Sequence, residues 1–349
     1  MGILGGGQLG RMLAIAASRL GYHTVVLDPD ASAPAAQLTN DHVVTPYDDP
    51  QGLSRLAELC DVVTYEFENV PDAAVELLAP NLAVHPGAFP LSVAQDRLVE
   101  KRYLNDAGIS TARFVEVNSQ DDVVAAVEEL GGQAILKTRR FGYDGKGQLR
   151  IDAAVPDDAF EQLGNAPLIA EGFVDFSCEI SVIGARSADG TTACFDPARN
   201  DHHDGILAVS SVPTLLDQSI EEAARTSATA LLKSLDYVGV LGLELFVLDD
   251  GTLLGNEFAP RVHNSGHWTE AACAVSQFEQ HIRAVTGLPL VNPTRHSDCV
   301  MQNLIGDQVL HLEEHLANPN CLVHLYGKAE VRPGRKMGHI TTLLSLIHI

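Results

Sequence analysis

Two glutamates, Glu244 and Glu257, occupy matched places in two apolar segments and could bind a metal ion together. The segments, residues 239–248 and 252–257, are separated by an Asp-Asp-Gly turn, which predicts a β-hairpin with the glutamates on neighbouring strands. Two inward carboxylates on apolar strands need a cation, and Mg²⁺ bridging phosphates, or Mn²⁺ in its place, is the expected one. The alternative is that one glutamate pairs with Arg261 while the other is exposed.

The segment that follows, residues 257–268, is dense in polar groups. Arg261, His263 and Asn264 fall within four positions of one another, a set suited to holding a small planar anion by charge-assisted hydrogen bonds. A single histidine here would more often be structural. Because burying so many donors beside a metal without a ligand would be costly, the run as a whole indicates an anion site.

A glycine-rich turn, residues 141–148, follows Lys137 at the end of a predicted strand. A backbone with three glycines and a lysine can wrap a triphosphate and exclude water from it. The turn is not a Walker P-loop, because no G-K-[ST] sequence opens a helix. The alternative interpretation is a plain surface hairpin turn.

A second glycine motif, residues 5–10, satisfies G-x-G-x-x-G between a predicted strand and a predicted helix, with Asp28 at the end of the next strand. This spacing is typical of dinucleotide-binding sites, where glycines let a phosphate approach the N-terminus of a helix. A nicotinamide-dependent oxidoreductase is therefore one alternative, and a purely structural turn is another. The carboxylates and cations later in the chain fit phosphate chemistry better than hydride transfer.

The charge of the chain is strongly negative overall, with 23 Lys and Arg against 46 Asp and Glu and a net charge of -23. This balance argues against nucleic acid or an anionic membrane as a partner. Eight of the 23 cations fall within residues 97–146, and four more within residues 328–336. These two stretches are therefore predicted to bind phosphate groups, the second through a Pro-Gly turn that would otherwise be a solvated basic turn.

The composition predicts a globular chain of two or three domains, since it has 349 residues of which 46% are hydrophobic. Six cysteines lie far apart without a C-x-x-C pair, which predicts reduced thiols rather than a zinc site or a disulfide framework. No apolar run approaches about 18 residues, and no cleavage signal opens the chain. We therefore expect a cytoplasmic protein without a membrane anchor.

Three units must position these residues. Residues 1–95 alternate strand and helix patterns and predict a small Rossmann-like domain with a parallel sheet. Residues 96–170 predict a lid in which two strands clasp the glycine-rich turn. Residues 171–349 predict period-two strands, a long helix at 219–235 and the carboxylate hairpin, with a short β segment at 321–331. The predicted fold class is α/β, with α+β parts.

Five motifs together resemble the ATP-grasp superfamily, and within it the N5-carboxyaminoimidazole ribonucleotide synthetases of purine biosynthesis. They are GGGQLGRM, GYDGKGQ, DGIL, NEFAPRVHNSGHWT and EVRPGRKMGH, and the likeness covers nearly the full chain. The resemblance implies an ATP-dependent ligase that carboxylates the exocyclic amine of 5-aminoimidazole ribonucleotide with bicarbonate, by way of carboxyphosphate. It also implies a homodimer.

For ATP, the resemblance implies phosphate contacts from Arg97 and Lys137, a phosphate-covering loop, an adenine hinge and a ribose contact at Glu179. Residues 200–207, which end in DGIL, would be a loop beside the nucleotide, with His202 contacting ATP, and Glu244 and Glu257 would bind Mg²⁺. The remaining nucleotide residues implied are Gly142, Tyr143, Asp144, Gly145, Lys146, Gly147, Gln148, Glu171, Gly172, Phe173, Val174 and Asn256.

For the other two substrates, the resemblance implies one group of residues around the ribonucleotide and another around bicarbonate. Tyr143 and Asp144 would lie near the reacting amine, with Asp144 counted among the catalytic residues. The ribonucleotide would also contact Gln8, Leu9, Glu66, Lys328 and Arg335, the last two at its 5'-phosphate. Bicarbonate would be held by Arg261, His263 and Asn264.

Departures from the resemblance and alternatives to it remain at this point. Arg199 stands where many relatives have glutamate, and Cys178 where glycine is frequent. Residues 344–349 read as a foreign end, from which we expect a truncated reading frame. The alternatives are another ATP-grasp ligase or formyl transferase for a related ribonucleotide, the nicotinamide oxidoreductase, and a nucleotide-binding sensor without catalysis.

Overall fold

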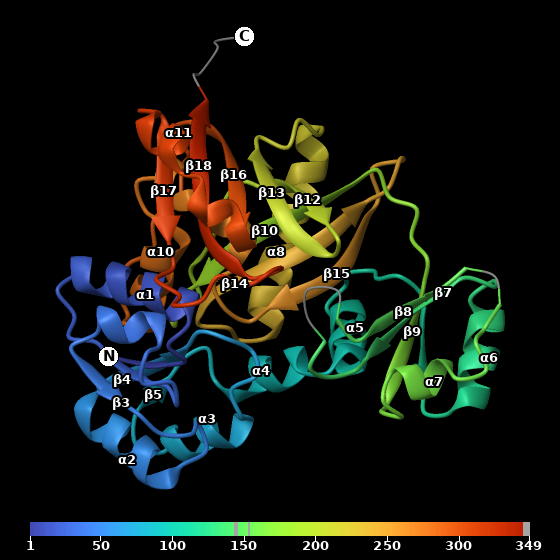
Figure 1. The fold of residues 1–349 in the computed structure, drawn as a ribbon, viewed down its shortest axis with the longest axis horizontal. Helices are drawn as coiled ribbons and strands as arrows, with labels where there is room; N and C mark the ends of the chain where they lie inside the picture. The colour runs from blue at the N-terminus through green and yellow to red at the C-terminus, as the bar shows by residue number, and fades with distance from the viewer. Residues whose placement is uncertain (143–145, 153, 345–349) are drawn as a thin grey trace.

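The chain folds around three β-sheets, which Figure 1 shows as three lobes. The computed structural model describes residues 1–142, 146–152 and 154–344. Within these ranges no helix is both long enough and apolar enough to cross a bilayer.

The first lobe is a five-stranded parallel sheet with the order β3-β2-β1-β4-β5. Its strands are short and apolar, and β1 and β2 are buried along their whole length because helices cover both faces. Residues 5–10 join β1 to α1 at the carboxyl edge of this sheet. The elements are β1 (Gly2–Leu4), α1 (Gln8–Arg19), β2 (Val25–Leu27), η1 (Pro34–Gln37), β3 (Asp41–Val43), α2 (Pro50–Leu59), β4 (Val62–Tyr65), α3 (Asp72–Leu78), β5 (Ala83–Val84) and α4 (Ala88–Ala94).

The second lobe is a four-stranded antiparallel sheet with the order β6-β9-β7-β8. Two helices cover it, and Ser119 caps the longer one by accepting a hydrogen bond from the amide of Asp122. The predicted pair of strands on either side of the glycine-rich turn is present, with Lys137 opposite Gln148. The elements are α5 (Arg97–Asp106), β6 (Phe114–Val117), α6 (Gln120–Glu129), β7 (Ala134–Thr138), β8 (Gln148–Ile151), α7 (Ala159–Gln162) and β9 (Leu168–Gly172).

The third lobe is a nine-stranded sheet with the order β15-β14-β10-β12-β13-β16-β18-β17, in which β11 pairs with β10. Its core merges with that of the first lobe, because α1 packs against α10. The elements are β10 (Cys178–Arg186), β11 (Thr192–Cys194), β12 (Ala198–His203), β13 (Ile206–Val212), α8 (Gln218–Ser234), β14 (Gly239–Val247), β15 (Leu253–Ala259), η2 (Asn264–Gly266), α9 (Thr269–Ala272), α10 (Gln277–Val285), β16 (Asp298–Ile305), η3 (Gly306–Leu310), α11 (Glu313–Ala317), β17 (Cys321–Leu325) and β18 (Lys336–Leu344).

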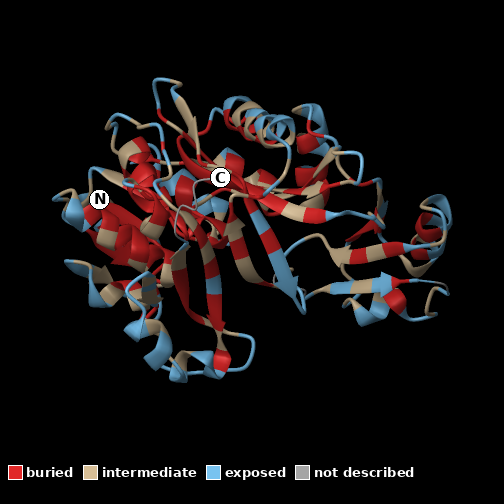
Figure 2. Ribbon diagram, turned by 90° about the horizontal axis from the view of Figure 1, so that it is seen from above, coloured by how far each residue is buried: buried red, intermediate tan, exposed pale blue. Residues whose placement is uncertain are grey.

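Buried residues gather in the first and third lobes, whereas the four-stranded sheet stands to one side of them with much of its surface exposed (Figure 2). The second lobe has a separate small core of its own. It therefore has the construction expected of a lid, joined to the rest of the molecule mainly through α5 and the segment after β9.

Two predictions about local structure need correction. The segment 200–207, predicted as a loop, is the end of β12, a turn and the first residues of β13, while its place beside the nucleotide stays a prediction. The predicted β segment at 321–331 ends early, at Leu325, and its strand pairs with β18, which begins at Lys336. The first error arose because β12 is rich in polar residues and lacks the alternation that marks a strand.

Candidate active site

A cavity of about 500 Å³ lies where the three lobes meet. Most of its lining side chains are charged or polar, which fits ionic ligands better than an apolar one. The predicted residues among those that line it are Gln8, Leu9, Glu66, Arg97, Gly142, Glu244, Glu257, Arg261, His263, Asn264 and Lys328. Lining residues that were not predicted include Glu68, Asn69, Gln95, Glu100, Arg139 and Lys336.

The two carboxylates of the predicted hairpin lie directly opposite each other, Glu244 on β14 and Glu257 on β15. The register shifts immediately beside them, because Leu245 faces Gly255 and leaves Asn256 as the extra residue of a β-bulge. Such a bulge redirects a side chain and ends regular pairing. The hairpin therefore presents two acids to the cavity at one level, with Asn256 beside them.

Arg97, at the first position of α5, forms an ion pair with Glu257 at 2.7 Å and donates a hydrogen bond to the carbonyl of Gly142 at 3.1 Å. Burial would raise the pKa of Glu257, but this guanidinium lowers it to about 2. For Glu244, burial and then the charge of Glu257 raise the pKa to about 7. The alternative in which Arg261 pairs with Glu257 is wrong, since Arg97 takes that place.

The donor set of this hairpin fits a hard divalent cation. Two carboxylates face one cavity, and burial together with the charge of Glu257 opposes ionisation of Glu244. Oxygen donors of this kind are the ligands that Mg²⁺ takes, usually together with phosphate oxygens. Glu244 and Glu257 are therefore the residues that would hold Mg²⁺.

Lys137 lies on β7 outside the lining of the cavity and pairs with Glu171 at 3.0 Å. Lys101, which the sequence did not single out, contacts the same carboxylate at 3.3 Å and donates a hydrogen bond to the carbonyl of Asn256 at 2.7 Å. Burial would raise the pKa of Glu171, but the two lysines lower it to about 2. A cationic cluster thus surrounds one buried acid between the lid and the hairpin.

The predicted hinge begins at Glu171 and Gly172, at the end of β9, and continues through Phe173 and Val174 as irregular chain. The ring of Phe173 is 43% exposed, and the guanidinium of Arg150 lies 4.4 Å from its centroid. An exposed aromatic ring at the junction of two lobes offers an apolar surface against which a planar base could pack. These residues lie outside the lining of the cavity.

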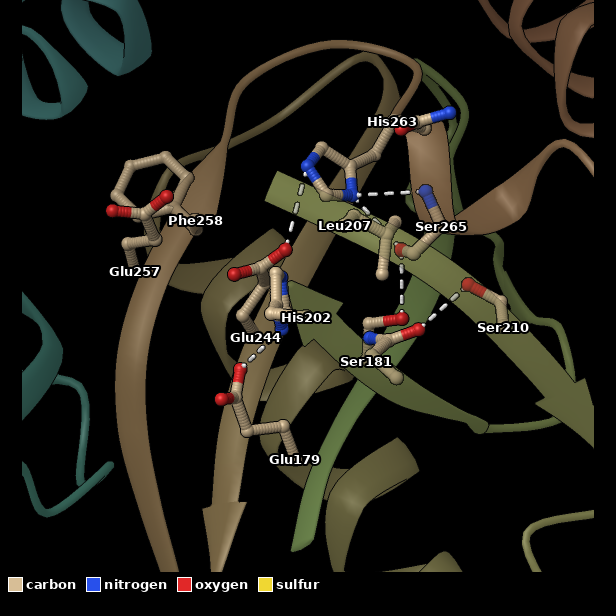
Figure 3. Close-up of polar contacts among 12 residues, drawn as sticks. Glu179, Ser181, His202, Leu207, Ser210, Glu244, Glu257, Phe258, His263 and Ser265 are labelled. Atoms are coloured by element: carbon tan, nitrogen blue, oxygen red, sulfur yellow. Dashed lines mark hydrogen bonds and ion pairs between the residues drawn. The ribbon is translucent and has the colours of Figure 1, made fainter. Parts of the chain in front are cut away.

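Glu179 and His202 form a pair on neighbouring strands, with Nδ1 of His202 3.0 Å from Oε2 of Glu179 (Figure 3). Burial would lower the pKa of His202, but the contact with Glu179 raises it. In the same view both residues lie on the Glu244 side of the site. The two predicted nucleotide contacts are therefore neighbours, although neither lines the cavity.

His263 points toward Glu244, with Nε2 3.5 Å from Oε1 of that carboxylate (Figure 3). Its Nδ1 lies 2.8 Å from the hydroxyl of Ser265, which in turn accepts a hydrogen bond from Ser181 at 2.7 Å. Burial and then the charge of Arg261 lower the pKa of His263 to about 3. His263 is therefore neutral at physiological pH and can offer either a donor or an acceptor.

The other two residues of the predicted bicarbonate site are held by partners that were not predicted. Nε of Arg261 donates a short hydrogen bond to Glu68, and Nη1 donates one to the carbonyl of Val262 at 3.1 Å. Asn264 and Asn303 exchange side-chain amide hydrogen bonds at 2.9 and 2.8 Å. Arg261, His263 and Asn264 all border the cavity, so the structure brings the three together.

At the first glycine turn the protein fills the position that a phosphate would take. Glu66 accepts hydrogen bonds from the amides of Gly7 and Gly10, both at 2.6 Å, and Asp28 accepts one from Gly6 at 2.7 Å. A Cβ on Gly7 would lie 2.5 Å from Oε1 of Glu66. This turn is glycine-rich because an acid of the protein packs on it, which removes the main argument for a dinucleotide site.

The C-terminal cations approach the same cavity. Nζ of Lys328 donates hydrogen bonds to the side chain of Gln8 and to the carbonyl of Lys336, both at 2.6 Å. Lys336 also lines the cavity, whereas Arg335 does not and instead donates to the carbonyl of Glu330 at 3.0 Å. Lys336 lies in the basic stretch 328–336 that was predicted to bind phosphate, but it was not named among the ribonucleotide contacts, although it stands beside Arg335 in the RPGRK motif.

The glycine-rich loop is described only at its ends. Gly142 borders the cavity, and the carbonyl of Gly147 accepts a hydrogen bond from the amide of Thr138 at 2.8 Å. Lys146 and Gln148 lie on the other arm, outside the lining. The predicted residues Tyr143, Asp144 and Gly145 lie outside the described residues.

Glu68 and Glu100 are the acids that sequence reasoning missed. Glu68 follows β4 two residues after Glu66, and that spacing was a signal for both facing one side. Glu100 is buried on α5 and accepts a hydrogen bond from the amide of Phe258 at 2.7 Å. Nothing in its helical pattern distinguishes it from a surface glutamate.

Family models match almost the whole chain. An ATP-grasp domain matches residues 102–278, a ribonucleotide synthetase preATP-grasp domain matches residues 1–95, and a phosphoribosylaminoimidazole carboxylase C-terminal domain matches residues 299–347. The predicted ATP-grasp fold with an N-terminal parallel sheet is confirmed.

Individual relatives are similar over the same length. An N5-carboxyaminoimidazole ribonucleotide synthase of Brucella melitensis is 58% identical over 346 residues, which is 98% of this chain and 96% of the relative. The structure of an ADP complex of N5-carboxyaminoimidazole ribonucleotide synthetase has a TM-score of 0.95 at 41% identity, covering 98% of this chain and 92% of that one. A synthase from Aspergillus clavatus in complex with ADP and 5-aminoimidazole ribonucleotide has a TM-score of 0.91 at 34% identity, covering 98% and 93%.

Proposed function

The chain belongs to the N5-carboxyaminoimidazole ribonucleotide synthase family, as its five motifs predicted, and on this premise we propose that it carboxylates 5-aminoimidazole ribonucleotide with ATP and bicarbonate. The product is N5-carboxyaminoimidazole ribonucleotide, an intermediate of purine biosynthesis. The observation that carries this proposal is the meeting of three chemically distinct groups at one cavity: the acids Glu244 and Glu257, the anion-holding set around Arg261, and the lysines Lys328 and Lys336.

ATP binds between the lid and the carboxylate hairpin in this proposal. Glu171, Gly172, Phe173 and Val174 hold the adenine, while Glu179 and His202 lie at the ribose. Arg97 and Lys137 neutralise the phosphates, which carry charge that spreads over their oxygens during transfer. The glycine-rich loop, including Tyr143, Asp144 and Gly145, covers them, with Lys146, Gly147 and Gln148 on its second arm.

Glu244 and Glu257, with Asn256 beside them, are the residues that would hold Mg²⁺ together with the nucleotide. Mg²⁺ would supply neutralisation of the phosphate charge, as divalent ions do in phosphoryl transfer. Arg97 contacts Glu257 at 2.7 Å without nucleotide, so it stands within reach of the same phosphates. The acids of the hairpin and Arg97 on α5 therefore act together on the charge of the phosphates.

The first chemical step is attack of a bicarbonate oxygen on the γ-phosphorus of ATP. The new oxygen–phosphorus bond forms as the bond to the bridging oxygen of ADP breaks, which yields carboxyphosphate and ADP. Arg261, His263 and Asn264 hold the bicarbonate in line. Neutral His263 can donate a hydrogen bond to the anion without adding charge to a site that already contains Arg261.

The second step transfers the carboxyl group to the exocyclic amine of the ribonucleotide. A carbon–nitrogen bond forms, inorganic phosphate leaves, and the amine loses a proton. Gln8, Leu9 and Glu66 contact the ribonucleotide, and Lys328 with Arg335 binds its 5'-phosphate, to which Lys336 adds a cation on the cavity wall. Asp144, which lies outside the described residues, is expected to act near the reacting amine. Closure of the lid keeps water from the short-lived carboxyphosphate.

The organisation and setting of the protein follow from the same proposal. Residues 1–95, 96–170 and 171–349 form the N-terminal domain, the lid and the C-terminal domain. The enzyme acts in the cytoplasm as a homodimer, with small-molecule substrates and without nucleic acid or membrane partners.

Phosphate release tests this proposal directly. Purified protein is incubated with ATP, Mg²⁺, bicarbonate and 5-aminoimidazole ribonucleotide, and each component is omitted in turn. We expect release to fall to background without ATP or Mg²⁺ and to depend on the ribonucleotide. Release that is indifferent to the ribonucleotide would overturn the substrate assignment, and tight ATP binding without turnover would favour a sensor.

A further inference from the structure

A second cluster of metal-binding side chains lies on the other side of β18 from the nucleotide residues. It consists of Glu270 on α9, His324 on β17 and His339 on β18, and the two histidines are directly opposite each other in the antiparallel register. Oε2 of Glu270 lies 3.0 Å from Nδ1 of His324 and 3.6 Å from Nε2 of His339. None of the three lines the 500 Å³ cavity or takes part in the proposed reaction.

The donor atoms of this cluster converge without all satisfying one another. One atom from each residue lies within 4.8 Å of the other two. Oε2 of Glu270 contacts His324, but Nε2 of His339, which is shielded from solvent, lies beyond hydrogen-bond distance of this oxygen and has no other partner among the described residues. His339 is 1% exposed. Polar atoms left unpaired in the interior are costly. A cation bound within the cluster would satisfy this nitrogen.

We propose that Glu270, His324 and His339 bind one divalent transition-metal ion, with Zn²⁺ as the best fit. Two imidazole nitrogens and one carboxylate oxygen form a donor set typical of Zn²⁺. Metal–ligand bonds of about 2.0–2.1 Å in a tetrahedral site place neighbouring donor atoms about 3.4 Å apart, which the two contacts of Glu270 bracket. Mg²⁺ prefers oxygen donors, so this site is distinct from the Glu244–Glu257 pair in chemistry as well as in place.

The surroundings of His339 orient it for metal binding. Its Nδ1 lies 2.9 Å from the hydroxyl of Tyr326, a fully buried side chain. Metal binding requires the tautomer in which Nδ1–H donates to this oxygen, which would leave the lone pair of Nε2 facing Glu270. A hydrogen bond on the remaining ring nitrogen is the arrangement that metal-bound histidines almost always have.

The cluster has an entry path and a mechanical role. Glu270 and His324 border a cavity of about 260 Å³, which gives an ion access and leaves room for water at a fourth position.

A bound ion would join α9 to β17 and β18. These two strands lead to Lys328 and Lys336, and Nζ of Lys328 lies 5.5 Å from the ring centroid of Tyr326. The ion therefore acts as a brace for the strands that deliver both lysines.

Metal content of the full-length protein tests the proposal. Protein stripped with a chelator is titrated with Zn²⁺ alone, and bound metal is counted after gel filtration by elemental analysis. We expect one equivalent in the wild type, retained in the presence of excess Mg²⁺, and a rise in Tm on Zn²⁺ addition. Co²⁺ in its place should give the visible absorption of a tetrahedral nitrogen–oxygen site.

Variants show which residues bind the one equivalent of Zn²⁺. Glu270→Gln and His324→Ala should each lower Zn²⁺ affinity at least tenfold and abolish the Tm rise. His311→Ala removes an exposed histidine outside the cluster and should retain the full equivalent. Glu257→Gln should also retain it, because that residue belongs to the nucleotide site.

The outcomes that overturn the proposal are equally definite. Uptake by the wild type below about a tenth of an equivalent would show that the cluster is a metal-free hydrogen-bonded group. Loss of the equivalent in Glu257→Gln, with retention in Glu270→Gln, would place the ion at the carboxylate hairpin instead. Should Glu270→Gln fail to fold, the Co²⁺ spectrum of the wild type and its loss in His324→Ala decide the question, since the side chain of His324 is only partly buried.

Discussion

The two glycine-rich segments of this chain look alike in sequence and differ in what their backbones face. At residues 5–10 the amides of Gly7 and Gly10 are already bound to the carboxylate of Glu66, which belongs to the protein itself. At the turn after Lys137, Gly142 borders an open cavity and its carbonyl accepts a hydrogen bond from Arg97. A glycine motif therefore predicts that something approaches the backbone closely, but not whether it is a ligand or a neighbouring side chain.

The largest effect on activity is expected from a substitution at the open cavity, which would support the difference between the two glycine-rich segments. Glu257→Gln removes a carboxylate from the proposed Mg²⁺ site and the ion-pair partner of Arg97, so we expect turnover to fall at least about 10³-fold. Circular dichroism and Tm should show an intact fold. Glu128→Gln, which alters an exposed acid on α6, is the matched control and should be fully active. Near-normal turnover in Glu257→Gln would contradict the site.

A smaller effect, on stability, is expected at the first glycine turn. Gly7→Ala places a Cβ 2.5 Å from Oε1 of Glu66, so the turn or the carboxylate must shift, and we expect a loss of about 1–3 kcal/mol in the free energy of unfolding. Urea denaturation measures it. Gly172→Ala is the control, because its Cβ would meet nothing nearer than 3.5 Å. Unchanged stability in Gly7→Ala would mean that Glu66 does not fill the turn as described.

The matching substitution in the other glycine segment should change activity and not stability. A Cβ on Gly142 would lie 3.1 Å from the carbonyl oxygen of Lys146 and 3.6 Å from Nη2 of Arg97. We therefore expect Gly142→Ala to lower kcat about tenfold through the loop, with the free energy of unfolding within about 0.5 kcal/mol of the wild type. If stability and not kcat were lost, the two glycine segments would be equivalent and the comparison would fail.

The smallest effect is expected at Glu100, beside the phosphate region. Burial and then the charge of Glu257 raise the pKa of Glu100 to about 8, above the ordinary value of 4.5. The folded state then holds its proton more tightly than the unfolded chain, so the contribution to stability is full below about pH 4.5 and is lost as the pH rises through 8.

Glu100→Gln keeps an acceptor for the amide of Phe258 and removes the charge. We expect a Tm equal to that of the wild type near pH 5 and higher by a few degrees at pH 9, measured by calorimetry. An equal Tm at both pH values would show that Glu100 is ionised in the folded protein throughout this range.

Local pattern was sufficient to predict the carboxylate hairpin, because both strands are apolar apart from Glu244, Asn256 and Glu257, and the turn between them has a distinctive sequence. It was also sufficient for the long helix predicted at 219–235, which is α8 (Gln218–Ser234) in the structure. It failed for β12, where Asn200, Asp201 and the two histidines resemble a loop in composition. Such strands are held by their neighbours in the sheet, and pairing between distant segments leaves no trace in a local window.

The same limit applies to the site. The sequence indicated which residues could bind ions or substrates, but not which residue each of them would contact in the folded protein. Arg97 meets Glu257, and Arg261 meets Glu68, through contacts between lobes that are more than a hundred residues apart in the chain. The opposed histidines His324 and His339 were missed for the same reason, because their proximity depends on β18 lying beside β17.

The ion pair between Arg97 and Glu257 has a consequence for the order of binding. A Mg²⁺ ion that entered the hairpin without a nucleotide would compete with Arg97 for the carboxylate of Glu257. The displaced guanidinium of Arg97 would then face the ion at close range. If Mg²⁺ arrives bound to a triphosphate, the phosphates bring negative charge with them. Arg97 can then pair with a phosphate in place of Glu257. Because this exchange would keep every charge matched, we expect Mg²⁺ to enter together with the nucleotide as a complex and to bind poorly by itself.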